Sequence, residues 1–119
     1  MVDTGNNALR RIDPERFITT VAGEPPGGDG DGTGPRIGLR WPTGIAVSAD
    51  GTAWVADHGN GAVRRVAADG ASHTTLRLAG LRWPLSLVIR SDETLFLTGT
   101  SLNEFHRPEA CLVVVGGAR

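Results

Sequence analysis

The chain has 119 residues, the size of one domain, and its 12 basic residues nearly balance its 13 acidic ones. A net charge of −1 provides no field for nucleic acid or for an anionic membrane, so we expect neither partner. The sequence shows no apolar run of the roughly 20 residues that a spanning helix needs, and no secretory signal at its start, so a soluble, cytoplasmic protein is the default expectation.

The sequence repeats itself. Leu39-Arg40-Trp41-Pro42 recurs 42 residues later as Leu81-Arg82-Trp83-Pro84, and residues 2–12 match residues 56–66 almost throughout. A period near 42 residues with several short strands is typical of the blades of a β-propeller. The sequence therefore predicts an all-β chain, a partial propeller of four-stranded antiparallel blades. Its two to three blades are not a closed ring, because known propellers use about 4–8.

Four regions follow one another within this single domain of residues 1–119. Residues 1–23 are expected to form a partial blade that starts at the end of its second strand, and residues 24–38 a Gly/Asp-rich loop between blades. Residues 39–80 form the complete blade, and residues 81–119 a degenerate or incomplete one.

Strands are predicted from the apolar runs between turns. In the complete blade they fall at residues 43–48, 53–57, 62–67 and 72–78. Strand interiors such as Trp54-Val55-Ala56 are apolar at consecutive positions, which favours strands covered on both faces. We expect Trp54 to be more than about four-fifths buried. In the last unit we favour a loop over residues 99–109 and a third strand at 110–115, with residues 104–107 as the alternative.

The complete unit carries a recognisable motif. Leu39-x-x-Pro42-x-Gly44-Ile45-Ala46-Val47, followed by Trp54-Val55-Ala56-Asp57-x-x-Asn60-x-x-Val63-x-Arg65-Val66, closely resembles the NHL repeat. This resemblance implies a propeller scaffold. In that family such scaffolds mostly bind proteins, some bind RNA, and some related propellers carry metal-dependent lyase or hydrolase sites. The fold alone does not choose among these functions. The structural repeat positions are Asp3, Asn6, Pro42, Gly44, Asp57, Asn60 and Pro84.

Asp3 and Asp57 end equivalent strands, and each is followed three residues later by an asparagine, Asn6 or Asn60. One interpretation makes these side chains ligands around a channel. Their recurrence in each unit favours a structural role, in which carboxylate and amide bind nearby backbone N–H groups and fix a hairpin. We therefore expect Asp57→Ala to cost about 1–3 kcal/mol of stability without removing an activity.

The glycine-rich loop offers the nearest candidates for a metal site, Asp29 and Asp31. Counted from Asp29, the loop matches the first half of a helix–loop–helix calcium site, but Arg40 stands where the bidentate glutamate should be. No flanking helices are expected either. We therefore expect a solvated loop, and neither a metal nor another cofactor.

No residue set predicts catalysis. The three histidines, His58, His73 and His106, lie in different segments without zinc-ligand spacing, and Cys111 opens an apolar stretch typical of a buried small side chain. Nucleophile-elbow and phosphate-loop motifs are absent from the sequence. The arginine pairs at residues 10–11 and 64–65 place one side chain on each strand face, where we expect salt bridges between blades.

These observations favour a non-catalytic interaction scaffold, a fragment of a larger protein that binds an unidentified protein partner. The alternative is a fragment of a propeller enzyme, a metal-dependent lyase or hydrolase, whose catalytic blades lie outside this chain. Open blade edges also predict self-association, through an outer face that we expect to be lined by Leu87, Ile89, Phe96 and Leu97.

Overall fold

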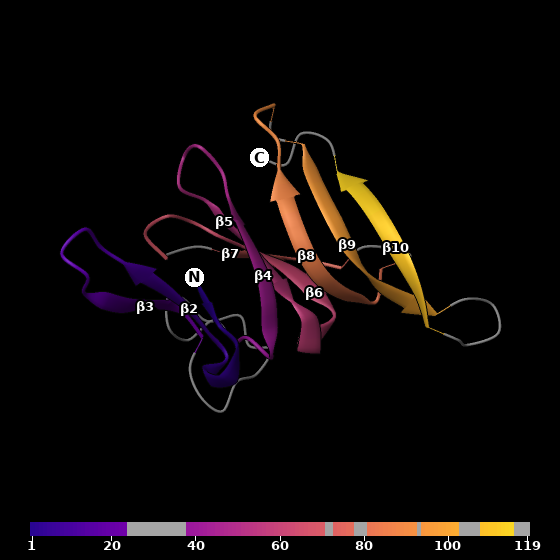
Figure 1. The fold of residues 1–119 in the computed structure, drawn as a ribbon, viewed down its shortest axis with the longest axis horizontal. Coiled ribbons are helices and arrows are strands. Elements are labelled where there is room, and N and C mark those ends of the chain that lie inside the picture. Colours follow the sequence, from indigo (N-terminus) through magenta and orange to yellow (C-terminus); the bar gives the residue numbers. More distant parts are fainter. Residues whose placement is uncertain (24–37, 71–72, 78–80, 93, 103–107, 116–119) are drawn as a thin grey trace.

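Three antiparallel sheets lie side by side in chain order in the computed structural model (Figure 1). The structure describes residues 1–23, 38–70, 73–77, 81–92, 94–102 and 108–115. The described elements are strands and two short 3-10 turns, and none of the three sheets closes on itself. The all-β, partial-propeller prediction is confirmed. Within the described part of the chain, no helix has the length and hydropathy to cross a membrane.

The first sheet consists of β1 (Val2–Asp3), β2 (Ala8–Ile12) and β3 (Ile18–Ala22), paired in that order. A single 3-10 turn, η1 (Thr4–Asn6), joins β1 to β2. This turn closes with Asn7 in the left-handed conformation at φ 53°, which asparagine tolerates better than most residues. The predicted turn after Asp3 is therefore present.

The middle sheet is a four-stranded meander of β4 (Pro42–Val47), β5 (Ala53–Asp57), β6 (Ala62–Val66) and β7 (His73–Leu76). Every strand lies within one or two residues of its predicted position. The turn between β4 and β5 forms because Gly51 takes φ 85° and the Asp50 carboxylate accepts hydrogen bonds from Ser48 Oγ and the Thr52 N–H. A second 3-10 turn, η3 (His58–Asn60), joins β5 to β6.

The third sheet consists of β8 (Trp83–Ile89), β9 (Leu95–Leu102) and β10 (Pro108–Val115). The predicted third strand at 110–115 lies within β10, whereas the alternative at 104–107 lies outside the described residues. The predicted loop over 99–109 is wrong at both ends, because β9 continues through Gly99 to Leu102 and β10 begins at Pro108. Pro108 stands at the first position of a strand at the sheet edge, where its missing N–H breaks no ladder bond.

The middle sheet is buried on both faces. Trp54 and Ala56 point into a core shared with the third sheet, while Ala53 and Val55 point into a core shared with the first. All five residues of β5 are buried, and Trp54 is only 3% exposed, which confirms the prediction for that residue. The consecutive apolar residues of this strand thus pack alternately into two separate cores.

The predicted outer face of the third sheet is wrong in part. Leu87 and Leu97 are buried and belong to the core against the middle sheet, and Ile89 packs against that core. Because strand side chains alternate, the opposite face carries Val88, which is 62% exposed, together with the half-buried Phe96. Self-association through this face stays a prediction.

Candidate functional site

Asp57 ends β5 at the centre of a buried polar cluster. Its Oδ2 accepts hydrogen bonds from Asn60 Nδ2 at 2.8 Å and from Arg64 Nη1 at 3.3 Å, and its Oδ1 accepts one from the Arg40 N–H at 2.7 Å. The prediction placed the bonds of Asp57 on nearby backbone N–H groups that fix a hairpin. One observed bond comes from a backbone N–H, that of Arg40, and Asp57 thereby ties the hairpin side chains to the segment that leads into β4.

The Asp57–Arg64 pair is enclosed by its own chain. Both side chains are essentially without solvent contact, and Arg64 Nη1 also donates to the Gly38 carbonyl at 2.9 Å. Burial raises the pKa of the Asp57 carboxyl, while the bonds from Arg40, Asn60 and Arg64 oppose that rise. A carboxylate held by three donors inside the protein is structural and is not placed to receive an external ligand.

The first sheet repeats this cluster at its surface. Asp3 Oδ2 accepts from Asn6 Nδ2 at 3.0 Å and from Arg10 Nε at 3.3 Å, and Arg10 Nη1 donates to Thr20 Oγ1 at 2.5 Å. The described ion pairs of Arg10 and Arg64 therefore each join residues of a single sheet, and not residues of neighbouring blades as predicted for these two arginines. In each of the two sheets, the motif supplies both the aspartate and the arginine of the ion pair, so no residue of a neighbouring sheet is needed to form it.

The third sheet lacks the cluster. Gly99 stands at the position of Asp57, and each pairs with the proline of the preceding strand, Pro84 or Pro42. A Cβ added at Gly99 would lie 2.3 Å from the Trp83 carbonyl and 2.6 Å from Leu81 Cδ1. Leu81 thus occupies the space that a side chain at position 99 would need.

Hydrogen bonds to backbone carbonyls join the sheets. Thr4 Oγ1 donates to the Pro42 carbonyl at 2.7 Å, and His58, its equivalent in the middle sheet, places Nδ1 2.9 Å from the Pro84 carbonyl. Arg11 Nη2 donates across the first interface to the Ala68 carbonyl at 3.2 Å. The imidazole of His58 therefore links two blades, which accounts for it without a metal.

Three exposed arginines gather around the η3 turn. Arg77 Nη1 donates to the Asn60 carbonyl at 2.6 Å, and the Gly59 N–H donates to the Arg40 carbonyl at 2.8 Å. Arg82 lies on the other side of the turn, because a Cβ added at Gly61 would come within 2.7 Å of its carbonyl. We call this end of the sheets the arginine end; it comprises Arg40, Trp41, the η3 turn, Arg77 and Arg82.

Trp41 is the exposed aromatic side chain of the arginine end. It is 56% exposed although it is a large apolar residue, and its φ is 51°, a left-handed value that a side chain of this size rarely adopts. The Trp41 N–H donates to Asn7 Oδ1 at 2.6 Å, which helps to hold this conformation. Backbone strain of this kind is typical of residues with a functional role.

The opposite end of the sheets carries several carboxylates that bind their own turns. Asp13 accepts from the Phe17 N–H, Asp50 from Ser48 and Thr52, and Asp92 from Arg90 and the Thr94 N–H. These acids bind the turns in which they lie, and hydrogen bonds from Ser48 and Thr52 lower the pKa of Asp50 to about 2. We call this the carboxylate end; its described acids are Asp13, Glu15, Asp50, Asp69 and Asp92.

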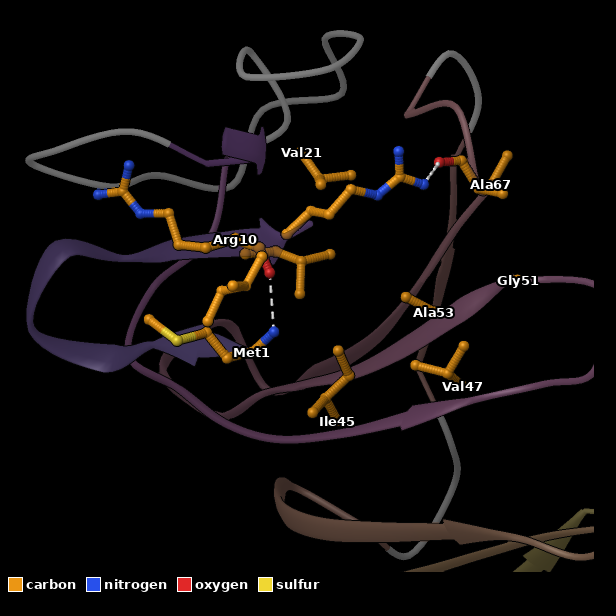
Figure 2. Close-up of a pocket in the computed structure, with 12 residues that line it drawn as sticks. Met1, Arg10, Val21, Ile45, Val47, Gly51, Ala53 and Ala67 are labelled. Atoms are coloured by element: carbon orange, nitrogen blue, oxygen red, sulfur yellow. Dashed lines mark hydrogen bonds between the residues drawn. The ribbon is translucent and has the colours of Figure 1, made fainter. Parts of the chain in front are cut away.

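An apolar groove of about 380 Å³ lies between the first and middle sheets (Figure 2). The Met1 amino group donates to the Arg10 carbonyl at 2.7 Å along one wall, and Ile45, Val47 and Ala53 face it from the other. Among the described residues that line the groove there is no acid, histidine or cysteine side chain. Its lining residues are Met1, Leu9, Arg10, Arg11, Ile12, Val21, Ile45, Val47, Gly51, Ala53, Ala67 and Ala68.

The described residues hold no group of three or more metal-ligating side chains. The calcium candidates Asp29 and Asp31 lie outside the described residues, as do His106 and the side chains of His73 and Cys111. Among the repeat positions, the structure brings Asp3 to Asn6 and Asp57 to Asn60. The arginine end was not predicted; its signal was the recurrence of Arg-Trp at residues 40–41 and 82–83.

Residues 39–65 match the family model of the NHL repeat. A solved streptogramin B lyase structure is similar to this chain with a TM-score of 0.59 at 16% identity, over 90% of this chain and 34% of that one. The virginiamycin B lyase from Staphylococcus aureus, also 16% identical, gives a TM-score of 0.45 over 92% of this chain and 50% of the lyase. Among curated proteins no match was found.

The fold is that of part of a β-propeller, and at this identity the structural similarity extends to the fold alone. The chain contains an NHL repeat in its middle sheet and spans about a third of the length of the streptogramin B lyase.

Proposed function

We propose that this chain is a non-catalytic propeller module that binds a protein partner through its arginine end. The observation that carries the proposal is Trp41, a large aromatic side chain that is 56% exposed on a left-handed backbone. Exposed tryptophan and arginine side chains are the types most enriched at the centres of protein interfaces. Trp41 directly follows the exposed Arg40, whose carbonyl accepts a hydrogen bond from the Gly59 N–H of the η3 turn.

The polar side chains of the repeat support a role without catalysis. Asp57, Asn60 and Arg64 are bound to one another, His58 is bound to the Pro84 carbonyl, and Asp3 is bound to Arg10. A catalytic acid or base needs a lone pair or proton within reach of a substrate. At these described positions, the carboxylates and the imidazole that could serve as acid or base are held in structural hydrogen bonds and ion pairs.

The test places a photo-crosslinking amino acid at position 41 and identifies the protein that it captures in native cell extract. The captured protein is then purified and titrated calorimetrically against the unmodified chain. Trp41→Ala should weaken its binding by about tenfold or more, as expected for a central interface residue. Phe17→Ala is the matched control, because Phe17 is 70% exposed at the carboxylate end.

Two outcomes would contradict the proposal. One is binding of the purified partner that Trp41→Ala leaves unchanged. The other is turnover, which the competing hypothesis of a propeller enzyme predicts. Because the matched structures are named as lyases of streptogramin B and virginiamycin B, the chain is incubated with a streptogramin B antibiotic, with and without divalent metal. Loss of substrate by chromatography would favour the enzyme.

A further inference from the structure

The groove between the first and middle sheets lies where the repeat carries a tryptophan one interface further on. Strands β1 and β2 correspond to β5 and β6, because the two pairs share one pairing register. In this register Met1 corresponds to Val55, and the position of Trp54 has no counterpart in the first sheet. The groove of about 380 Å³ can therefore be compared with the same place in the next interface.

The wall of the groove repeats the surroundings of Trp54. Ile45, Val47 and Ala53 line the groove from the middle sheet (Figure 2). Their equivalents in the third sheet, 42 residues later, pack in one core with Trp54; they are Leu87, Ile89 and Leu95. The groove therefore has the lining that receives an aromatic side chain at the next interface, and it is wider there because Val47 and Ala53 are the smaller residues.

A guanidinium group at the groove also matches the surroundings of Trp54. Arg11 lines the groove and corresponds to Arg65, whose guanidinium lies 5.5 Å from the centroid of the Trp54 ring. Arg11 is exposed, and its Nη2 donates to the Ala68 carbonyl on the other side of the interface. A guanidinium attracts the face of an aromatic ring, so the groove favours an aromatic side chain over an aliphatic one.

The strand edge beside the groove is open. In the part of the chain that the structure describes, β1 is the edge strand of its sheet, whereas β5 is flanked by β4. Strand β2 also extends past β1: Ile12 has no described partner on that side, whereas its equivalent Val66 pairs with Ala53. The unpaired N–H and C=O groups of a strand edge can bind an added strand.

From this geometry we infer that the groove binds an extended segment of another polypeptide. The segment adds a strand to the first sheet beside β1 and places an aromatic side chain between Arg11 and the apolar wall of β4 and β5. Main-chain hydrogen bonds supply affinity in this mode of binding, and the side-chain pocket supplies specificity. The groove shares no residue with the arginine end, so this second site goes beyond the proposed function and does not depend on it.

A second copy of this chain suits the groove less well than another polypeptide. The described edge strands are β1, β3, β4, β7, β8 and β10, and among them only β8 contains Trp, Tyr or Phe. That residue is Trp83, and its ring already carries the Arg82 guanidinium at 5.0 Å from the centroid. The described edges of this chain thus offer no open aromatic side chain to the groove.

The test uses a synthetic hairpin peptide with the sequence of residues 42–54, which contains β4 and the first two residues of β5. Its ends are acetylated and amidated, and a fluorophore allows its binding to the purified full chain to be followed by anisotropy. We expect saturable binding. A peptide with alanine in place of its tryptophan should bind about tenfold more weakly or less, because it leaves the aromatic position empty.

Variants of the chain locate the bound peptide. Val47→Trp should weaken binding about tenfold or more, because the new ring occupies the groove; Val47 is 56% exposed, so the substitution is expected to be tolerated. Val88→Trp is the matched control, on the opposite face of the third sheet at 62% exposure. Arg11→Gln should weaken binding about threefold, with Arg16→Gln as its control in the β2–β3 turn.

Four outcomes would overturn the inference. They are no binding of the peptide, equal binding of its alanine form, binding that Val47→Trp leaves unchanged, and self-association of the chain that Val47→Trp abolishes. The last of these would make a second copy the occupant. None of them affects the crosslinking at Trp41, so failure of this site and failure of the proposed function remain distinguishable.

Discussion

The first and middle sheets contain the same polar motif in different surroundings. The Asp–Arg distance is 3.3 Å in both, but the Asp57 and Arg64 side chains are at most 1% exposed, whereas those of Asp3 and Arg10 are 28% and 24% exposed. Local sequence therefore sets the geometry of the motif, and the neighbouring sheet sets its burial. The same Asp–Arg contact can therefore contribute very different amounts to the free energy of unfolding in two repeats of one chain.

The comparison is tested most directly by removing each aspartate. Asp57→Ala should destabilise the protein by about 3–5 kcal/mol, more than the sequence-based expectation, because it leaves the buried charge of Arg64 unpaired. Asp3→Ala should cost about 0.2–1 kcal/mol, since water reaches its partner. Urea unfolding followed by circular dichroism measures both. Equal losses of stability in the two variants would show that burial does not control how much the motif contributes to the free energy of unfolding.

Two equivalent glycines give the next largest difference. Gly59→Ala should cost about 1–3 kcal/mol, because its Cβ would lie 2.6 Å from the Arg40 carbonyl and 2.7 Å from Arg40 Cγ. Gly5 is its equivalent in the first sheet, and a Cβ there meets nothing within 4 Å. Gly5→Ala should therefore change stability by no more than about 0.5 kcal/mol. Thermal melting of the two variants provides the check; a larger loss at Gly5 would contradict the packing described around η3.

A smaller effect is expected where the two sheets use different residues for the same bond. His58→Val should lose about 0.5–1.5 kcal/mol with the bond to the Pro84 carbonyl. His58→Thr should recover most of that loss, because Thr4 makes the equivalent bond to the Pro42 carbonyl at 2.7 Å. Chemical unfolding of the pair measures the difference. No recovery by threonine would mean that the imidazole stabilises the middle sheet in another way.

The smallest effect is a dependence on pH with opposite signs at two aspartates. Burial raises the pKa of Asp57, so its proton is held more tightly in the folded state, and its contribution to stability falls as pH rises from 3.8 through the folded value. The pKa of Asp50 is lowered to about 2, so its contribution is present above 3.8 and is lost as pH falls towards 2. Carboxyl NMR titration separates the two groups. Asp57→Asn should remove the change above pH 3.8 only, and titration of Asp57 below 3.8 would contradict its burial.

Sequence patterns predicted the strands of the middle sheet because each lies between turn residues with a specific backbone role, such as Asp50-Gly51. They failed at Leu87 and Leu97, where an apolar run does not say which face meets a neighbour, and at Pro108, whose effect depends on whether its strand lies at an edge. At the candidate site, the recurrence of Asp and Asn predicted bonds to backbone N–H groups, but not the hydrogen bond between the two side chains. The bond from Arg40 and the gathering of three arginines depend on segments brought together only by the fold.

The hydrogen bonds between sheets affect how this chain tolerates amino-acid substitutions during evolution. Thr4, His58 and Arg11 all reach backbone carbonyls of the next sheet, which are present whatever side chain stands there. Substitution on the accepting side therefore requires no matching substitution on the donating side. Neighbouring repeats joined in this way can diverge in sequence independently, and paired changes between homologues should be found within sheets, as at Asp57 and Arg64, more often than across them.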